Sequence, residues 1–416
     1  MYPTVSGAFS LKLQRYISDN WYFFYLNASR RTTLCDLQVL IFANPTAKSL
    51  KVLRKDLSDN RQCMTKLNSP FNTLNEATIK ADLANWKKIV AKYQVPSWSK
   101  AIWQLVNSFG PFVALWVAMY FAVDYSIWLT LGLGVINAFF LVRIFIIQHD
   151  CGHFSFTKSR KANEAIGWVC SYFSTIPYNY WARVHSYHHG HTGQLEHRDI
   201  GDIDFLTVDE FRVKSKWDKF KYRLFRNPFV IFGIVPVIYL AVMLRLSKIT
   251  FPGWKKVHIK QHINNVTLVA IYVGLGWLVG WQKFLIVQGS VVFFFGVIAF
   301  WFFYVQHQHE DTYMRWTKQW DYLLAAIRGA TFYKLPRFMH FLTGNIGFHH
   351  IHHLSSRIPN YNLRKCAKEN PILQKYVTSI TFFESLPMMF NKLWDEETAR
   401  MITFKEYYRR EQVRMT

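Results

Sequence analysis

The chain has 416 residues, of which 51% are hydrophobic and 18% aromatic, and its formal net charge is +24. Many of the apolar residues lie in long blocks, so the composition excludes a purely soluble multidomain protein and indicates a protein of the bilayer. A basic excess is also typical of nucleic-acid binding, but no helix-turn-helix, Cys/His finger or RNA-binding signature occurs. We therefore expect no nucleic-acid partner and attribute the charge to basic loops on a cytoplasmic membrane face.

The first part of the chain gives weak structural signals. Residues 1–72 form a basic, aromatic extension without a periodic pattern, and we treat Met64 as a possible natural start. Thr73-Leu-Asn-Glu76 resembles a capping box, which predicts a helix through about Tyr93 that ends before Pro96. We assign residues 73–100 to a cytoplasmic or interfacial helix.

Four hydrophobic blocks are long enough to cross the hydrocarbon core as helices. Residues 102–122 and 125–147 are separated by a link at Asp124-Tyr-Ser126 without basic residues, and residues 266–281 and 283–306 by a short turn at 280–283. We predict two hairpins. A further block, 228–246, contains Gly233 and Pro236 and precedes a basic stretch, so we assign it as re-entrant or interfacial.

The predicted topology follows from the parity of the spans. If the histidine clusters described below share one site, His307 must emerge on the same face as His149, which requires an even number of crossings between them. We therefore predict an all-α integral membrane fold with four transmembrane helices and a cytoplasmic helical cap. Residues 101–366 form the membrane domain, 166–181 lie along the interface, and 367–416 form a cytoplasmic C-terminal segment.

The histidines are clustered rather than scattered. None of the 16 precedes His149, and most lie in short groups at 149–153, 185–189, 307–309 and 349–353. On a helix, residues at i, i+3 and i+4 share a face, so HxxxH and HxxHH patterns direct imidazoles the same way, as metal ligation requires. The candidate ligands are His149, His153, His185, His188, His189, His307, His349, His352 and His353.

Nine imidazoles are too many for one zinc ion, which takes about four ligands, so the count predicts two metal ions. Imidazole suits iron, copper, zinc or nickel, so the count does not name the metal. Asp150 stands where a zinc protease of the HExxH type has glutamate, and no Glu-x-x-His pair of the soluble di-iron bundles occurs. We interpret His258, His262 and His340 as capping or solvated residues.

The motifs resemble those of the membrane fatty-acid desaturases, most closely the bacterial-type acyl-lipid delta-12 (omega-6) enzymes. The likeness runs from about residue 80 to 366. It rests on His149-Asp-Cys-Gly-His153, His185-Ser-Tyr-His-His189 with the trailing Thr192-Gly193, the Gln306-His-Gln-His309 segment, and His349-His-Ile-His-His353 with the following Ile358-Pro-Asn-Tyr361.

The resemblance implies a di-iron centre held by the nine histidines, with O₂ as co-substrate and two electrons from an external donor. No fused cytochrome b5 segment occurs, so a separate ferredoxin or cytochrome b5 is implied, along with a membrane lipid substrate. The implied location is a bacterial inner membrane, with the active site on the cytoplasmic side. Residues that could support the ligands or the substrate are Asp150, His191, Glu196, His197, Asp199, Asp202, His309, Glu310, Asp311 and His350.

Other functions remain open from sequence alone. Two hydrogen abstractions give an alkene and hydroxyl rebound gives an alcohol, so a fatty-acyl hydroxylase is the alternative on the same scaffold. A membrane metal-binding or transport protein without enzymatic activity is the remote alternative. Phe154, Phe156, Trp181 and Phe348 lie near the boxes and could line an acyl channel or simply pack in the core.

Overall fold

The computed structural model describes residues 76–415, so the predictions for residues 1–72 and for a cap at Thr73 lie outside the described residues. The prediction of one continuous helix that runs through Tyr93 is wrong. The segment is divided into α3 (Glu76–Asp82) and α4 (Trp86–Ala91). The break lets Val90 and Tyr93 face the same buried cluster as Ile79 and Leu83.

The described residues contain four helices long and apolar enough to cross a membrane. They are α5 (Trp98–Ala122), α6 (Ile127–Gly152), α12 (Lys255–Val279) and α13 (Trp281–His307). Each covers most or all of one predicted block, although α6 begins two residues after the start of the block at 125–147 and α12 ends two residues before the end of the block at 266–281. Helix α12 begins eleven residues before the block at 266, within the basic stretch, because its first turns need no apolar side chains.

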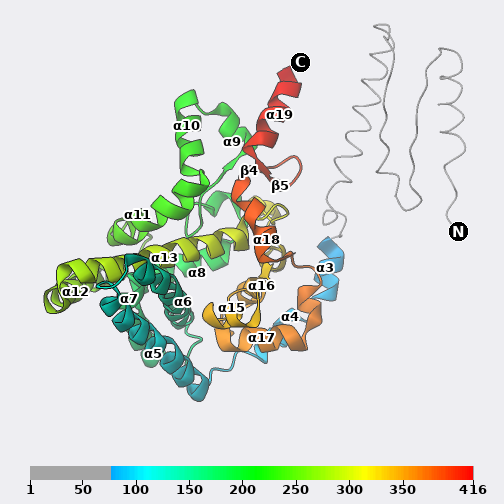
Figure 1. Cartoon of the computed structure of the whole chain (residues 1–416). Helices are drawn as coiled ribbons and strands as arrows, with labels where there is room; N and C mark the ends of the chain where they lie inside the picture. The colour runs from blue at the N-terminus through cyan, green and yellow to red at the C-terminus, as the bar shows by residue number, and fades with distance from the viewer. Residues whose placement is uncertain (1–75, 416) are drawn as a thin grey trace, which may run out of the picture. The chain divides into compact units, whose positions relative to one another are not determined.

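Helices α5, α6 and α13 pack closely against one another (Figure 1). A Cβ added at Gly134 of α6 would lie 3.1 Å from Ser290 Oγ of α13 and 3.2 Å from Met119 Cε of α5, so only a small residue permits this approach. Asp124, in the turn between α5 and α6, forms an ion pair with Lys283 at the start of α13. The α5–α6 and α12–α13 turns therefore lie at the same end of the helices.

The block predicted to be re-entrant is part of a bent pair. Helix α10 (Lys216–Phe225) is followed by the π-helical turn η3 (Val230–Ile234), α11 (Val235–Ala241) and the 3₁₀ turn η4 (Met243–Arg245), and the two parts make an angle of 57°. Pro236 opens α11 and lies against Gly296 of α13. The bend is compatible with a broken span or a re-entrant segment.

The second histidine box lies on a helix whose start is fixed by packing. Helix α7 (Arg160–Ser174) ends at Thr175, whose φ of 62° is left-handed, and α8 (Tyr178–His191) follows Pro177. The Tyr178 ring fills the space beside Gly167, where an added Cβ would lie 2.3 Å from the ring. Its hydroxyl donates to the Cys151 carbonyl at 2.8 Å, which fixes α8 beside the first box.

Two small sheets are departures from the predicted all-α fold, although the described residues are mainly helical. Strands β1 (Leu206–Thr207), β4 (Asn391–Asp395) and β5 (Arg400–Thr403) pair in that order, parallel and then antiparallel. Strands β2 (Phe332–Tyr333) and β3 (Ser379–Ile380) pair in parallel. The other helices are α9 (Val208–Val213), α14 (Tyr322–Arg328), α15 (Arg337–Leu342), α16 (His349–Leu354), α17 (Asn360–Glu369), α18 (Phe382–Ser385) and α19 (Phe404–Met415).

Two buried basic residues join β4 to the long helices. The Arg226 guanidinium donates to the carbonyls of Asp204 and Asn391, to Gln308 Oε1 and to the Tyr304 hydroxyl, at 2.6–3.0 Å. The Lys392 amino group donates to the Met389 carbonyl. We call this group the Arg226–Lys392 hub. It places both basic side chains against neutral oxygen atoms, and Arg226 ties β4 to the end of α13.

Candidate metal centre

Four elements distant in sequence bring the predicted ligands together. Helix α6 ends in the first box, α8 carries the second, α13 ends at His307, and α16 carries the third. The HxxxH and HxxHH spacings place each set on one helix face, as the periodicity predicts. Eight of the nine imidazoles form two groups of potential ligand atoms, all within 4.8 Å of one another in each group. The first is His149, His153, His185, His189 and His352, and the second is His188, His307 and His353.

The ninth histidine, His349, lies against the second group. Its Nε2 is 2.9 Å from Nε2 of His307 and 3.1 Å from Nε2 of His353. All nine predicted histidines therefore lie together, which agrees with the single site that the sequence analysis assumed when it counted the spans. The two groups touch at His352 and His353, neighbours on α16, and at His188 and His189 on α8.

The donor atoms fit metal ions. Nε2 of His189 lies 3.1 Å from Nε2 of His185 and 3.0 Å from Nε2 of His352. Two nitrogens that are each about 2.1 Å from one ion and at right angles to each other would lie about 3 Å apart. The buried Nε2 atoms of His149 and His153 have no hydrogen-bond partner. Because orphaned buried nitrogens are costly, this arrangement suits bound cations better than a purely structural role.

Several imidazoles are oriented through their other nitrogen. His149 Nδ1 lies 3.0 Å from Asp150 Oδ1, and His188 Nδ1 lies 3.1 Å from Asp202 Oδ2. His307 Nδ1 donates to the Gly329 carbonyl at 3.2 Å. Such contacts fix the tautomer and turn Nε2 toward the centre of the site.

A polar network supports Asp150 from behind. Its Oδ2 accepts hydrogen bonds from the backbone N–H of Asn360 at 2.6 Å and from the Asn360 amide at 2.8 Å. Gln104 of α5 donates to Asn360 Oδ1 at 3.0 Å. Sequence reasoning missed both amides. Asn360 belongs to the Ile358-Pro-Asn-Tyr361 motif and could have been found there, whereas Gln104 has no sequence signal.

Burial keeps the imidazoles outside the long helices neutral. Burial, with the added effect of neighbouring imidazoles, lowers the pKa of His153, His185 and His189 well below the usual value of 6.5. The same causes lower the pKa of His352 and His353. At neutral pH these rings have a free lone pair for a metal and release no proton when they bind it.

Most of the predicted supporting residues lie away from the ligands. His191 bonds to the Tyr187 carbonyl and its ring stacks on Tyr187, whose hydroxyl bonds to His197. Glu196 accepts from the Thr317 backbone, Glu310 pairs with Arg400, and Asp311 lies near Arg328.

His309 and His350 are buried but belong to neither group of ligand atoms. Burial lowers the pKa of each to about 3, so both rings are neutral at pH 7. Of the three other histidines, His262 is exposed and His258 bonds to Thr250 Oγ1 at 3.0 Å. The prediction that His340 is a capping or solvated residue is wrong, because it is buried and stacked on Phe348.

Aromatic rings cover part of the site. Trp181 stacks on His185 with ring centres 4.5 Å apart, and Phe303 of α13 lies against His188 and His307. Of the other rings considered for a channel, Phe156 is fully buried in the core, Phe348 stacks on Phe332, and Phe154 is 44% exposed. Of these four aromatic residues, Trp181 is therefore the one whose ring stacks on a box histidine.

The family model described as fatty acid desaturase matches residues 126–383, which is more than half of the chain and includes every histidine of both groups. This chain belongs to the fatty acid desaturase family. Its members are oxidoreductases, and the four long apolar helices and the histidine groups agree with that membership.

The relatives include bacterial and plant desaturases. A "Fatty acid desaturase" of Bacillus subtilis is 40% identical over 332 residues, which cover 80% of this chain and 94% of that protein. An "sn-1 oleoyl-lipid 12-desaturase" of Synechocystis is 27% identical over 238 residues, 54% of this chain and 63% of that protein. An "sn-2 acyl-lipid omega-3 desaturase (ferredoxin), chloroplastic" of Helianthus annuus is 27% identical over 244 residues, 56% of this chain and 54% of that protein.

Proposed function

We propose that this desaturase uses O₂ and two histidine-held iron ions to introduce a double bond into the acyl chain of a membrane lipid. The observation that carries the proposal is the pair of imidazole groups at the ends of α6 and α13, two helices able to cross a bilayer. Neutral imidazole is a ligand for iron, and the site lacks the Glu-x-x-His pairs of soluble di-iron proteins.

When bound, the iron pair supplies the oxidising power that no acid–base side chain has for an unactivated methylene. The nine histidines would hold it through Nε2, with His149, His188 and His307 fixed by their Nδ1 contacts. Trp181 and Phe303 cover part of the site with aromatic rings. In balance, one CH₂–CH₂ unit, O₂, two electrons and two protons give one double bond and two water molecules.

The substrate type, the electron donor and the membrane orientation are each supported by a different observation. The delta-12 acyl-lipid type is supported by the Synechocystis relative, whose name specifies 12-desaturation of an oleoyl lipid. An external electron donor, a ferredoxin or a cytochrome b5, is supported by the Helianthus annuus relative, whose name includes ferredoxin. We also propose four spans in two hairpins in a bacterial inner membrane, with the metal site and cap on the cytoplasmic side. The basic residues at the start of α12, near the histidine end, support this orientation.

The test is lipid analysis of a host that expresses the chain, beside a His188→Ala variant and a His262→Ala control. His188 belongs to the second group, whereas His262 is exposed on α12. We expect new double bonds, located by mass spectrometry, in the wild type and in the control, and a loss of more than about a hundredfold in His188→Ala. Hydroxylated products would contradict desaturation, and metal accumulation with an unchanged acyl profile would indicate transport instead.

A further inference from the structure

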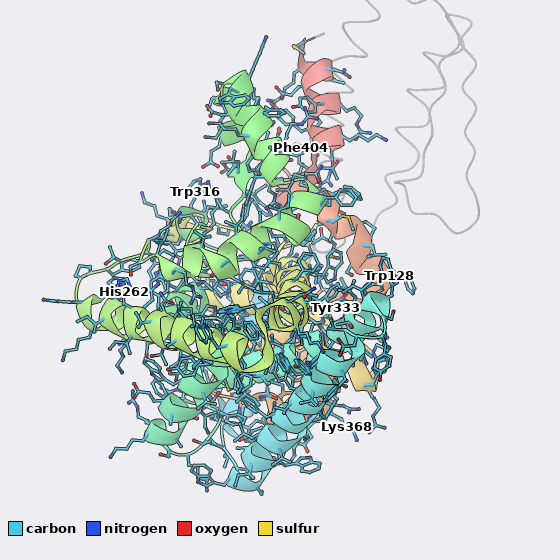
Figure 2. The ribbon with its side chains drawn as sticks, turned by 60° about the vertical axis from the view of Figure 1, so that its left-hand side comes forward. Trp128, His262, Trp316, Tyr333, Lys368 and Phe404 are labelled. Carbon is cyan, nitrogen blue, oxygen red and sulfur yellow. The ribbon has the colours of Figure 1, made fainter. Side chains whose placement is uncertain are left out.

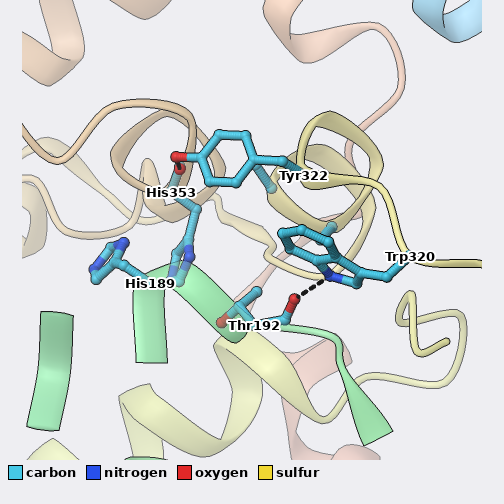
Figure 3. Close-up of a pocket in the computed structure, with 7 residues that line it drawn as sticks. His189, Thr192, Trp320, Tyr322 and His353 are labelled. Atoms are coloured by element: carbon cyan, nitrogen blue, oxygen red, sulfur yellow. Dashed lines mark hydrogen bonds between the residues drawn. The ribbon is translucent and has the colours of Figure 1, made fainter. Parts of the chain in front are cut away.

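A shallow pocket reaches the metal site beside the loop that precedes α14 (Figure 3). His189 and His353, one from each imidazole group, form its floor, and Thr192, Trp320, Tyr322 and Ala325 line the rest. Its space is about 150 Å³, part of it open to solvent. Because that figure includes open solvent and the enclosed part has no room for a water molecule, the pocket is not the substrate channel.

Two aromatic side chains connect this pocket to the ligands. Trp320 Nε1 donates to the Thr192 carbonyl at 2.8 Å, and the Thr192 hydroxyl lies 3.2 Å from His188 Nε2. The Tyr322 hydroxyl donates to the His353 carbonyl at 2.7 Å. Each ring is therefore only a few atoms from a candidate ligand of the second group.

The same rings extend outward to the surface. Tyr322 is 37% exposed, its ring centre is 6.2 Å from that of Trp320, and it stacks on Trp86 of α4 at 5.9 Å. Trp86 and Trp320 are both partly exposed. The three rings form a continuous aromatic surface, Trp86–Tyr322–Trp320, that lies directly above the two imidazole groups.

The segments that carry the aromatic surface are basic. Residues 76–92 and 315–322 contain six basic and three acidic residues. Lys80 pairs with Asp321 at the rim of the pocket at 2.8 Å. Within the described part of the chain, Lys87, Lys88 and Lys318 are exposed and have no carboxylate within ion-pair distance. An acidic partner could approach this surface with favourable charge.

We infer that the Trp86–Tyr322–Trp320 surface is the docking site of a small acidic one-electron carrier protein, from which electrons pass to the metal site. The inference rests on the proposed function, because desaturation consumes two electrons besides those of the two C–H bonds. Two reduced carrier molecules are oxidised by one electron each, and O₂, with the two hydrogens of the acyl chain and two protons, is reduced to two water molecules. Partly exposed aromatic rings with a basic rim are typical binding hot spots.

The experiment uses the full chain in lipid nanodiscs with a plant-type [2Fe–2S] ferredoxin as the probe. The affinity for ferredoxin is measured first, followed by the rate at which the chain oxidises reduced ferredoxin. Double-bond formation is then measured with dithionite and methyl viologen as the reductant instead of ferredoxin. The variants are Trp320→Ala and Tyr322→Ala. Trp316→Ala is the matched control, because Trp316 lies at the surface of the same loop, bonded to Glu396 and outside the pocket (Figure 2).

We expect each pocket variant to bind ferredoxin about tenfold more weakly and to oxidise it correspondingly slowly, whereas Trp316→Ala behaves as the wild type. Raising salt from 50 to about 200 mM should weaken wild-type binding. Iron content and turnover with the small reductant should be retained. If Trp320→Ala loses iron, the Trp320→Phe variant, which keeps an aromatic ring, is used in its place. Its affinity for ferredoxin is then compared with that of the wild type.

Undiminished binding in both pocket variants, an equal effect of Trp316→Ala, or no binding of ferredoxin to the wild type would overturn the inference. Failure of the proposed function has a different signature. In that case the wild type forms no double bonds even with dithionite and methyl viologen, whatever its affinity for ferredoxin.

Discussion

The two imidazole groups and the Arg226–Lys392 hub are both buried and polar, but they differ in how their polar atoms are satisfied. The Arg226 guanidinium makes four hydrogen bonds to oxygen atoms of the chain itself. In contrast, Nε2 atoms of the imidazoles face one another, and those of His149 and His153 have no partner. Burial alone therefore does not distinguish a structural polar group from a metal ligand, and a single missing partner does not either, because Arg226 Nε also lacks one. The convergence of several imidazole nitrogens within 4.8 Å of one another distinguishes the two regions.

The comparison predicts that the hub contributes mainly to stability and the imidazole groups mainly to metal binding. Arg226→Met would leave the carbonyls of Asp204 and Asn391 and Gln308 Oε1 without this donor. We expect a loss of about 3 kcal/mol in the free energy of unfolding, seen as a lower apparent melting temperature. Iron per folded chain should be unchanged. Loss of iron without a change in melting would break the distinction between the two regions.

The carboxylates that orient ligands should show a smaller, graded effect. The side chain of Asp150 is 1% exposed and that of Asp202 is 16% exposed, so water can replace part of the role of Asp202. We expect Asp150→Asn to lower iron affinity by about 10- to 100-fold, and Asp202→Asn by less. Competition with a chelator measures both.

Glu310→Gln provides the control for this pair, since Glu310 is exposed and bonded to Arg400 rather than to any histidine. Equal losses of iron affinity in Asp202→Asn and Asp150→Asn would mean that burial does not set the strength of the carboxylate–imidazole contacts.

The smallest expected effect concerns Lys392 and depends on pH. Burial, with a contribution from the Arg226 charge, lowers the pKa of Lys392 from 10.5 to about 6. Between about pH 6 and pH 10.5 the unfolded chain holds a proton that the folded chain does not, so the contribution of Lys392 to stability rises with pH in this window.

Lys392→Met removes the need to release that proton on folding. We expect the variant to melt a few degrees higher than the wild type at pH 7, with the difference shrinking toward about pH 10.5. Lys318→Met, at an exposed site, should show no such trend. A difference that grows with rising pH would contradict the assignment of a neutral, buried Lys392.

The sequence predicted the clustering of the box histidines better than the residues that surround them. The i, i+3 and i+4 spacing of the box histidines is local, so their shared helix faces could be predicted without tertiary structure. The common end for His149 and His307 was the premise from which an even number of spans was chosen, so the hydrophobic blocks did not predict it independently. Asn360, Gln104 and Trp320 could not be placed by these rules, because their roles depend on contacts between residues more than 100 positions apart.

The fold departed from prediction where tertiary packing outweighs local pattern. The strand pairings β1–β4 and β2–β3 join short segments distant in sequence, and two-residue strands give no periodic signal. Similarly, the break between α3 and α4 follows from the burial of Leu83 and Val90 against one cluster. His340 was misjudged because a single histidine in sequence does not reveal the aromatic ring that it stacks on.

Four helices end at the imidazole groups: α6 at the first box, α8 at the second, α13 at His307 and α16 at the third. The carboxyl end of a helix carries a partial negative charge of about half an electron, which acts over its last turn. Since imidazole is neutral, these histidines would not by themselves balance the charge of the two iron ions proposed above. The backbone of these helices supplies part of the anionic field that a carboxylate-rich site would obtain from side chains.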